Sequence, residues 1–376
     1  MDFIYNSFKI RYVKLNELFR ALKLEGIKSV TLYINLESIL NPLHQKSYEE
    51  YLTSATADSA NEEYKSVIAN IINIAAHYRQ YFTRERVFSN IVFFYNDFDA
   101  DGKYNNSVHI KKYRLNYHDM YNDDRYTRVN EIIRGAIEYC HKIVDFIDAV
   151  YILHSKRLDS SLIPYVCTDH KLLKSDLKII LTKDVYDWQY VNEGFLVMVP
   201  KGDDSVILYQ KIFMKYLLYK YDMLDKYKLE ISPLLYPFIL SVMGNKKRNL
   251  PKVKGIGFKK LYRELEKLYI KDYLSDEHPE SYNIEYLNDL IRTNNGFYNN
   301  QIKELITDNF YAIDIEKQIS ISNWDNADEI LSGLINRYDN NGLKRLNDKT
   351  FSDNPINLVE LNNYYPSMLK DGEVMP

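Results

Sequence analysis

Residues 244–263 combine glycines and basic side chains and contain no acidic residue. Pro251 and a turn from Gly255 to Gly257 separate two apolar segments that are compatible with helices. A glycine turn that leads into a helix presents backbone N–H groups to a phosphate, and nearby lysines add positive charge. The formal net charge of the whole chain is only -3, so this basic run predicts a local phosphate-binding site. Its basic residues are Lys246, Lys247, Arg248, Lys252, Lys254, Lys259, Lys260 and Arg263.

Two other interpretations of this run stay open. It could be a solvated, lysine-rich turn between helices, or it could bind an acidic protein partner. The apolar positions Leu250, Val253 and Ile256 favour an ordered turn and therefore phosphate contact. The residues that we predict to contact DNA are Lys246, Lys247, Lys252, Lys254, Gly255, Gly257, Lys259 and Lys260.

The composition is that of a soluble globular protein with room for a large core. The chain has 376 residues, of which 46% are hydrophobic and 27% are charged. The near-neutral charge argues against a protein that coats nucleic acid over its whole surface. Cys140 and Cys167 lack the spacing of a zinc ribbon, and they are expected to be buried thiols in a reducing compartment. No segment has the pattern of a signal peptide or a membrane span, so we expect a cytoplasmic protein without membrane contact.

Continuous apolar runs alternate with helical periodicity in the first part of the chain. This alternation predicts a parallel sheet with helices on both faces, with ligands beyond the carboxyl ends of its strands. The expected strands are 30–35, 90–95, 150–153, 177–182 and 195–199, and the expected helices are 15–24, 57–82, 127–146 and 160–167. From about residue 205 onward the pattern is mostly helical, with a last helix near 327–336. The predicted domains are a core at 1–205, a helical region at 206–270 and a C-terminal extension at 271–376.

Two segments resemble motifs of a known family. Residues 180–191 look like the strand-end run I-V-T-G-D-K-D-L-L-Q-L-V, and residues 244–257 resemble G-D-x-x-D-N-I-P-G-V-x-G-I-G. Both motifs belong to the 5′-nucleases, which are flap endonucleases and 5′–3′ exonucleases of the PIN-like superfamily. The resemblance covers about residues 30–270 and implies a PIN-like α/β core with a central, mostly parallel sheet between helices. It also implies a helix–hairpin–helix element that grips duplex DNA, often through a bound K⁺ ion.

The resemblance further implies two Mg²⁺ ions held by carboxylates at the sheet edge. Several of the expected carboxylates are absent. A positive charge ~4 Å from a divalent ion would repel it by roughly 8 kcal/mol at a dielectric constant near 20. The non-acidic residues at family carboxylate positions are Asn35, Arg157, Ser160, Tyr186, Asn245 and Arg248. The remaining candidates for a remnant metal site are Glu37, Asp159, Asp184 and Asp187, and the capping of a helix start is an equal alternative for Asp159 and Asp184.

The resemblance and the missing carboxylates together predict an inactive 5′-nuclease-like protein that acts by binding. Its partner would be DNA, or it would serve as a structural or accessory part of a phage genome-handling or virion assembly, with the extension contacting other proteins. The high tyrosine content, 35 residues, fits the coding bias of an AT-rich phage genome. We expect no cofactor apart from K⁺ at the hairpin. The alternative is an active Mg²⁺- or Mn²⁺-dependent enzyme that uses Glu37, Asp97, Asp184 and Asp187.

Overall fold

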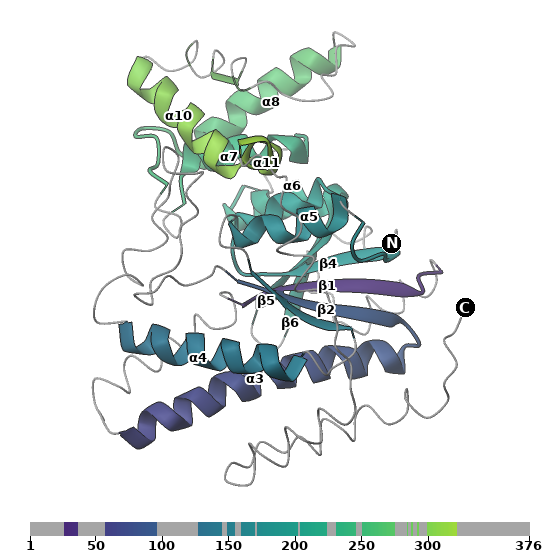
Figure 1. The fold of residues 1–376 in the computed structure, drawn as a ribbon. Coiled ribbons are helices and arrows are strands. Elements are labelled where there is room, and N and C mark those ends of the chain that lie inside the picture. The colour runs from purple at the N-terminus through teal and green to yellow at the C-terminus, as the bar shows by residue number, and fades with distance from the viewer. Residues whose placement is uncertain are drawn as a thin grey trace.

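One six-stranded sheet organises the protein (Figure 1). The computed structural model describes residues 26–36, 57–95, 127–144, 149–154, 159–169, 171–201, 204–223, 231–245, 250–274 and 299–321, together with 284, 287, 288 and 292. The strand order is β3-β2-β1-β4-β5-β6. The strands are β1 (Ser29–Asn35), β2 (Phe88–Phe94), β3 (Val150–Leu153), β4 (Leu177–Leu181), β5 (Leu196–Lys201) and β6 (Asp204–Leu208).

The sheet is parallel except at one edge. β1 pairs with β2 on one side and with β4 on the other, and β4 pairs with β5, all in parallel. β6 pairs antiparallel with β5. This edge strand was not predicted, because we expected helical structure from about residue 205 onward. It also crosses the predicted domain boundary at that residue.

Two long helices cover one face of the sheet. α3 (Ala57–Arg84) and α4 (Thr127–Val144) pack against each other and lie below the sheet in Figure 1. Successive side chains of a strand point to opposite faces, and Leu32 and Ile34 belong to the core on this side, whereas Tyr33 belongs to the other core. The apolar faces of the two helices therefore pack against every second residue of the central strand.

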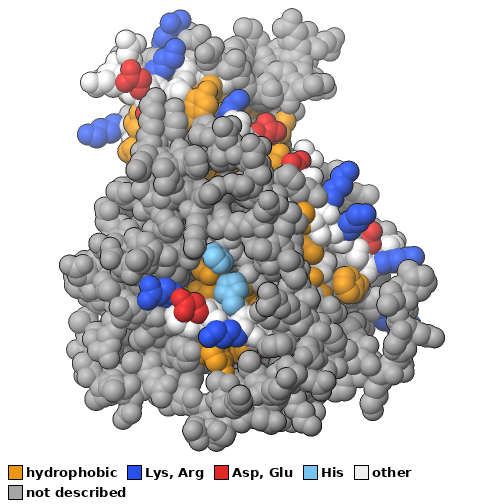
Figure 2. Space-filling view, in the orientation of Figure 1, with side chains coloured by type: hydrophobic (Ala, Val, Ile, Leu, Met, Phe, Trp, Pro, Cys, Tyr) orange, Lys and Arg blue, Asp and Glu red, His pale blue; other side chains and the backbone are white. Residues whose placement is uncertain are grey.

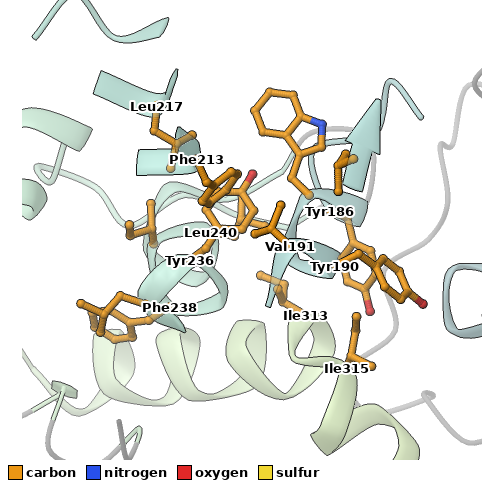
Figure 3. Packing of buried hydrophobic residues seen from close by; sticks show 14 of the residues in the cluster. Tyr186, Tyr190, Val191, Phe213, Leu217, Tyr236, Phe238, Leu240, Ile313 and Ile315 are labelled. Atoms are coloured by element: carbon orange, nitrogen blue, oxygen red, sulfur yellow. The ribbon is translucent and has the colours of Figure 1, made fainter. Parts of the chain in front are cut away.

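The opposite face is covered by several shorter helices. One buried cluster continues from the sheet through these helices to the last described ones (Figure 3). The aromatic rings of Tyr186, Tyr236 and Phe213 belong to this cluster. The helices are η4 (Ser160–Leu162), α5 (Ile163–Asp169), η5 (Asp187–Val191), α6 (Gln210–Lys220), η6 (Pro233–Leu235), α7 (Tyr236–Met243), α8 (Phe258–Leu274), α10 (Asn300–Ile313) and α11 (Ile315–Ile321).

The predicted fold class is confirmed. A mostly parallel sheet lies between helices, α7 and α8 form a helix–hairpin–helix element, and the described part of the C-terminal region is helical. The helices expected at 15–24 and 327–336 lie outside the described residues. Among the helices that are described, none has both the length and the apolar character needed to cross a membrane.

Candidate functional site

The topology marks a place for a ligand between β1 and β4. From β1 the chain continues to β2 on one side of the sheet, whereas β4 lies on the other side. At such a switch point the connections leave in opposite directions, and a crevice opens beyond the carboxyl ends of the two strands. Asn35 is the last residue of β1, and Thr182 directly follows β4. The resemblance places its carboxylate site at this same edge.

A buried hydrogen-bond network occupies this position. The Nδ2 of Asn35 donates to Oδ2 of Asp187 over 3.0 Å, and the hydroxyl of Thr182 donates to the same oxygen over 2.6 Å. All three side chains are buried, and Asp187 has an exposed fraction of 0%. The side-chain amide of Asn35 thus contacts the Asp187 carboxylate directly, where a carboxylate at residue 35 would instead need a shared proton or a cation between the two groups.

The remaining residues of this strand-end segment hold its turn. The backbone N–H of Asp184 donates to the Thr182 hydroxyl, and Oδ1 of Asp184 accepts from the backbone N–H of Tyr186, each over 3.0 Å. Asp184 therefore closes the turn ahead of η5, whose N-cap residue is Tyr186. The side chain of Tyr186, at a position where the family has an aspartate, is buried in the apolar cluster (Figure 3).

Buried phenols surround the acidic turn and stay protonated. Burial raises the pKa of Tyr190 well above its usual value, and the negative charge of Asp187 adds to this effect. Burial likewise raises the pKa of Tyr236, with smaller contributions from other groups that include Asp184. The Tyr190 hydroxyl donates to the Ser161 carbonyl, and that of Tyr236 donates to the Val185 carbonyl over 2.8 Å. These phenols serve as hydrogen-bond donors that tie the turn to its neighbours.

Among the residues that the structure describes at this edge, the side chains do not by themselves fit the pair of divalent ions that the resemblance implies. Mg²⁺ needs several oxygen ligands in near-octahedral geometry and usually keeps bound water. Here one oxygen of Asp187 already accepts from Asn35 and Thr182, and an oxygen of Asp184 accepts from Tyr186. Within the described ranges, no group of three or more His, Cys, Asp or Glu side chains could hold a metal ion.

Asp159, another candidate for the remnant metal site, caps a helix. Its Oδ1 accepts from the backbone N–H of Ser161 over 2.9 Å at the start of η4, which confirms the capping alternative. The other predicted site residues near the sheet edge lie outside the described residues: Glu37, Asp97 and Arg157.

The basic hairpin lies between α7 and α8 and begins with a close backbone approach. Asn245 and Leu250 exchange two backbone hydrogen bonds, and the Val253 N–H donates to the Val242 carbonyl in α7 over 3.0 Å. Gly244 has φ of +67°, and a Cβ atom on it would lie 2.6 Å from the Leu250 carbonyl oxygen and 2.8 Å from the Lys252 nitrogen. Only glycine satisfies both the backbone conformation and the space at this position.

The tip of the hairpin presents charge and a helix start to solvent. Val253 and Ile256 are buried beneath it, whereas Lys252, Lys254 and Gly255 are exposed. Gly255 has φ of +79°, and the first hydrogen bond of α8 runs from the Leu261 N–H to the Gly257 carbonyl. The N–H groups of the first turn of α8 consequently have no intrahelical acceptor.

Lysines continue from this tip onto α8. Lys259 and Lys260, in its first turn, are exposed. Figure 2 shows Lys and Arg side chains over the upper part of the molecule, where Figure 1 places α8 and α10. The structure therefore brings together all the described members of the predicted DNA-contacting set: Lys252, Lys254, Gly255, Gly257, Lys259 and Lys260. Lys246, Lys247 and Arg248 lie outside the described residues.

Two side-chain amides connect the helices after the hairpin to the rest of the site. The Nδ2 of Asn309 in α10 donates to the carbonyls of Ser241 in α7 and Pro251 in the hairpin, over 2.7 and 2.9 Å. The Nε2 of Gln189 in η5 donates to the Ile313 carbonyl over 3.0 Å, and its Oε1 accepts from the Ile315 N–H over 3.3 Å. The hairpin, α10 and the strand-end segment are thereby joined.

Sequence reasoning gave no role to Thr182 or Asn309. The signal for Asn309 was a polar residue on the apolar face of Ile306, three residues before it, and Ile313, four residues after it. Such a residue needs buried hydrogen-bond partners, but the pattern does not identify them.

Comparisons with known proteins give structural matches only. No family model and no curated protein matches the chain. The T5 D15 protein crystallised with metal ions is similar at 11% identity and a TM-score of 0.49, covering 82% of this chain and 100% of the other. A DNA and metal-ion complex of bacteriophage T5 D15 flap endonuclease is similar at 11% identity and a TM-score of 0.47, and the match covers 81% of this chain and 97% of the other. T5 5′-exonuclease with bound zinc is similar at 12% identity and a TM-score of 0.43, and the match covers 80% of this chain and 99% of the other.

Proposed function

We propose that the protein binds DNA through its lysine hairpin and does not hydrolyse it. The proposal rests on the contrast between the lysine hairpin and the carboxyl ends of β1 and β4. The hairpin lysines face solvent, whereas Asn35 donates a buried hydrogen bond to Asp187 at the strand ends.

The binding half of the proposal rests on charge and backbone geometry. Lys252 and Lys254 at the tip, with Lys259 and Lys260 on the first turn of α8, flank N–H groups that lack intrahelical partners. A phosphate can accept from such N–H groups while the ammonium groups neutralise its charge. Lysine ammonium groups and backbone N–H groups contact phosphates, so we expect affinity for the DNA backbone without strong sequence preference.

The absence of hydrolysis is proposed from the hydrogen bonds at the strand ends. Metal-dependent phosphodiesterases need ions that activate water and stabilise the leaving oxygen. The Asp187 oxygen that accepts from Asn35 and Thr182 is buried, so an ion bound to that oxygen would compete with both contacts. A protein that binds without cutting suits an accessory role in a phage genome-handling assembly, in which the extension contacts other proteins.

The K⁺ ion that the resemblance implies is compatible with the hairpin. The Val253 carbonyl accepts only a long hydrogen bond, 3.5 Å, from the Ile256 N–H, so it keeps acceptor capacity for a cation. When bound by this carbonyl, the ion would supply further positive charge beside the lysines.

Charge reversal of the hairpin tests the proposal. Replacement of Lys252, Lys254 and Lys259 by glutamate should lower the affinity for a short blunt duplex about 100-fold at moderate salt, because phosphate contacts dominate such binding. The dependence of log K on log salt should become shallower by about 2.7 if three phosphate contacts are lost. Fluorescence anisotropy over a series of salt concentrations measures both quantities.

A matched triple variant controls for net charge. Arg84→Glu, Lys142→Glu and Lys174→Glu change exposed residues at the end of α3, on α4 and before β4. This control should keep its affinity within a few-fold of the wild type. Equal losses in both triple variants, or an unchanged salt dependence in the hairpin variant, would contradict a local DNA site.

A further inference from the structure

One buried side chain of α10 connects the lysine hairpin to the end of the helix before it. The Nδ2 of Asn309 donates to the Ser241 carbonyl over 2.7 Å and to the Pro251 carbonyl over 2.9 Å. Ser241 lies in the last turn of α7, where a helix leaves carbonyls without intrahelical donors, and Pro251 directly precedes Lys252. The amide therefore fixes the backbone at the point where the basic tip of the hairpin begins.

The same part of α10 is fixed to the core of the protein. The Nε2 of the buried Gln189 side chain donates to the Ile313 carbonyl over 3.0 Å, and its Oε1 accepts from the Ile315 N–H over 3.3 Å. Ile313 follows Asn309 by four residues, which is about one turn of the helix. One turn of α10 thus joins the hairpin to η5, by a route that does not pass through α7.

Backbone hydrogen bonds also hold the hairpin, but those that the structure describes run to α7 or within the hairpin itself. The Val253 N–H donates to the Val242 carbonyl over 3.0 Å, and two further bonds close the base of the hairpin. The Asn309 amide adds the connection to α10. Because Lys252 is the next residue after Pro251, a shift of the Pro251 carbonyl would move the tip relative to the lysines of α8.

We propose that Asn309 is a positioning residue for DNA binding, which orients the hairpin so that its tip and the first turn of α8 contact one phosphate backbone together. Asn309 is only 3% exposed, so it acts through the hairpin and not by contact with DNA. An amide suits this position because its two N–H groups donate to two carbonyls, which neither a carboxylate nor an apolar side chain can do. The inference rests on the proposed function, and it adds that a residue of the predicted C-terminal extension completes the DNA site.

Asn309→Leu should lower the affinity for a short blunt duplex about 10-fold, because substitutions in a connected network alter binding at a distant site by this order. The dependence of log K on log salt should become shallower by about 0.9 if one phosphate contact of the tip is lost. Fluorescence anisotropy over a series of salt concentrations measures both quantities, at a temperature where circular dichroism shows a folded variant.

Asn309→Asp gives a readout that loss of packing alone would not give. Burial and the two nearby carbonyls would raise the folded-state pKa of the new carboxyl group above its unfolded value of about 3.9. Above the raised pKa the carboxylate repels both carbonyls, whereas below it the protonated group can donate one hydrogen bond. Relative to the wild type at the same pH, the DNA affinity of this variant should therefore rise as the pH falls through the raised pKa. This profile also carries the test if Asn309→Leu does not fold.

Asn288→Leu is the matched control, because it removes another buried amide that contacts α10 but not the hairpin. The Nδ2 of Asn288 donates to the Thr307 hydroxyl over 3.1 Å, and Asn288 is 1% exposed. This variant should keep the wild-type affinity and salt dependence, even where its melting temperature falls as far as that of Asn309→Leu.

Wild-type affinity and salt dependence in a folded Asn309→Leu variant would overturn the positioning role, since the backbone bonds would then suffice. Equal losses in Asn288→Leu, or an affinity ratio of Asn309→Asp to the wild type that does not change with pH, would also overturn it. In all these cases charge reversal of the hairpin lysines would still weaken binding. Failure of the proposed function is distinguished by blunt-duplex binding that does not respond to that charge reversal.

Discussion

Asn35→Asp should destabilise the protein by about 3–5 kcal/mol at neutral pH, although it changes only one atom of the side chain. The Nδ2 of Asn35 lies 3.0 Å from Oδ2 of Asp187, and both side chains are buried. The variant replaces a donor with a second acceptor and brings two negative charges together at low dielectric. Urea denaturation, followed by circular dichroism, measures the free energy of unfolding.

The loss should depend on pH in a defined direction. Repulsion raises the pKa of the new carboxyl group in the folded state above its unfolded value of about 3.9. Below about pH 4 both states hold the proton, so the variant should approach the wild-type stability. As the pH rises through the raised pKa, the penalty should grow to its full size. A penalty that is independent of pH would contradict like-charge repulsion as its cause.

The exchanged pair is the matched control for this variant. Asn35→Asp combined with Asp187→Asn restores one amide and one carboxylate, with the donor and the acceptor reversed. The double variant should recover most of the stability that the single variant loses, as expected for two residues in direct contact. Additive losses in the double variant would argue against the direct contact.

Gly244→Ala should cost about 3–5 kcal/mol and should also weaken DNA binding. The glycine has φ of +67°, and an added Cβ would lie 2.6 Å from the Leu250 oxygen and 2.8 Å from the Lys252 nitrogen. Both atoms belong to the backbone of the hairpin, so they can move away only if the hairpin itself moves. Thermal unfolding and DNA anisotropy report the two effects.

Gly194→Ala separates backbone strain from this close approach. Gly194 has φ of +74°, but an added Cβ would meet no atom within 4 Å. Its cost should be limited to the backbone conformation, about 1–2 kcal/mol, and DNA binding should not change. If the two variants lost equal stability, close contact at Gly244 would not be the cause.

The architecture of the core was predictable because its signals are local. The strands that end at Asn35 and Leu153 are short apolar runs, and α3 and α4 repeat their apolar residues with helical spacing. β6 was missed because it is a five-residue edge strand, Asp204–Leu208, in which a polar start precedes only three apolar residues. Its assignment depends on pairing with β5, which no local pattern reports.

The site was predictable in position but not in its contacts. The strand-end motif placed Asn35 and Asp184 at one edge of the sheet, since parallel strands align their carboxyl ends. That Asp187 accepts from Asn35, 152 residues away, depends on the shape of the turn after β4. The contact of Asn309 with Pro251 is equally remote from local sequence, because it requires α10 to pack against α7.

The central claim is that this protein holds DNA without cutting it. The most direct measurement is incubation of the purified protein with end-labelled 5′-flap DNA in Mn²⁺, with bound and cleaved DNA resolved from the same sample. We expect a salt-sensitive complex from which the DNA is recovered intact. Divalent-dependent cleavage that disappears in Asp184→Ala would contradict the account and would instead indicate an active nuclease with a rearranged carboxylate site.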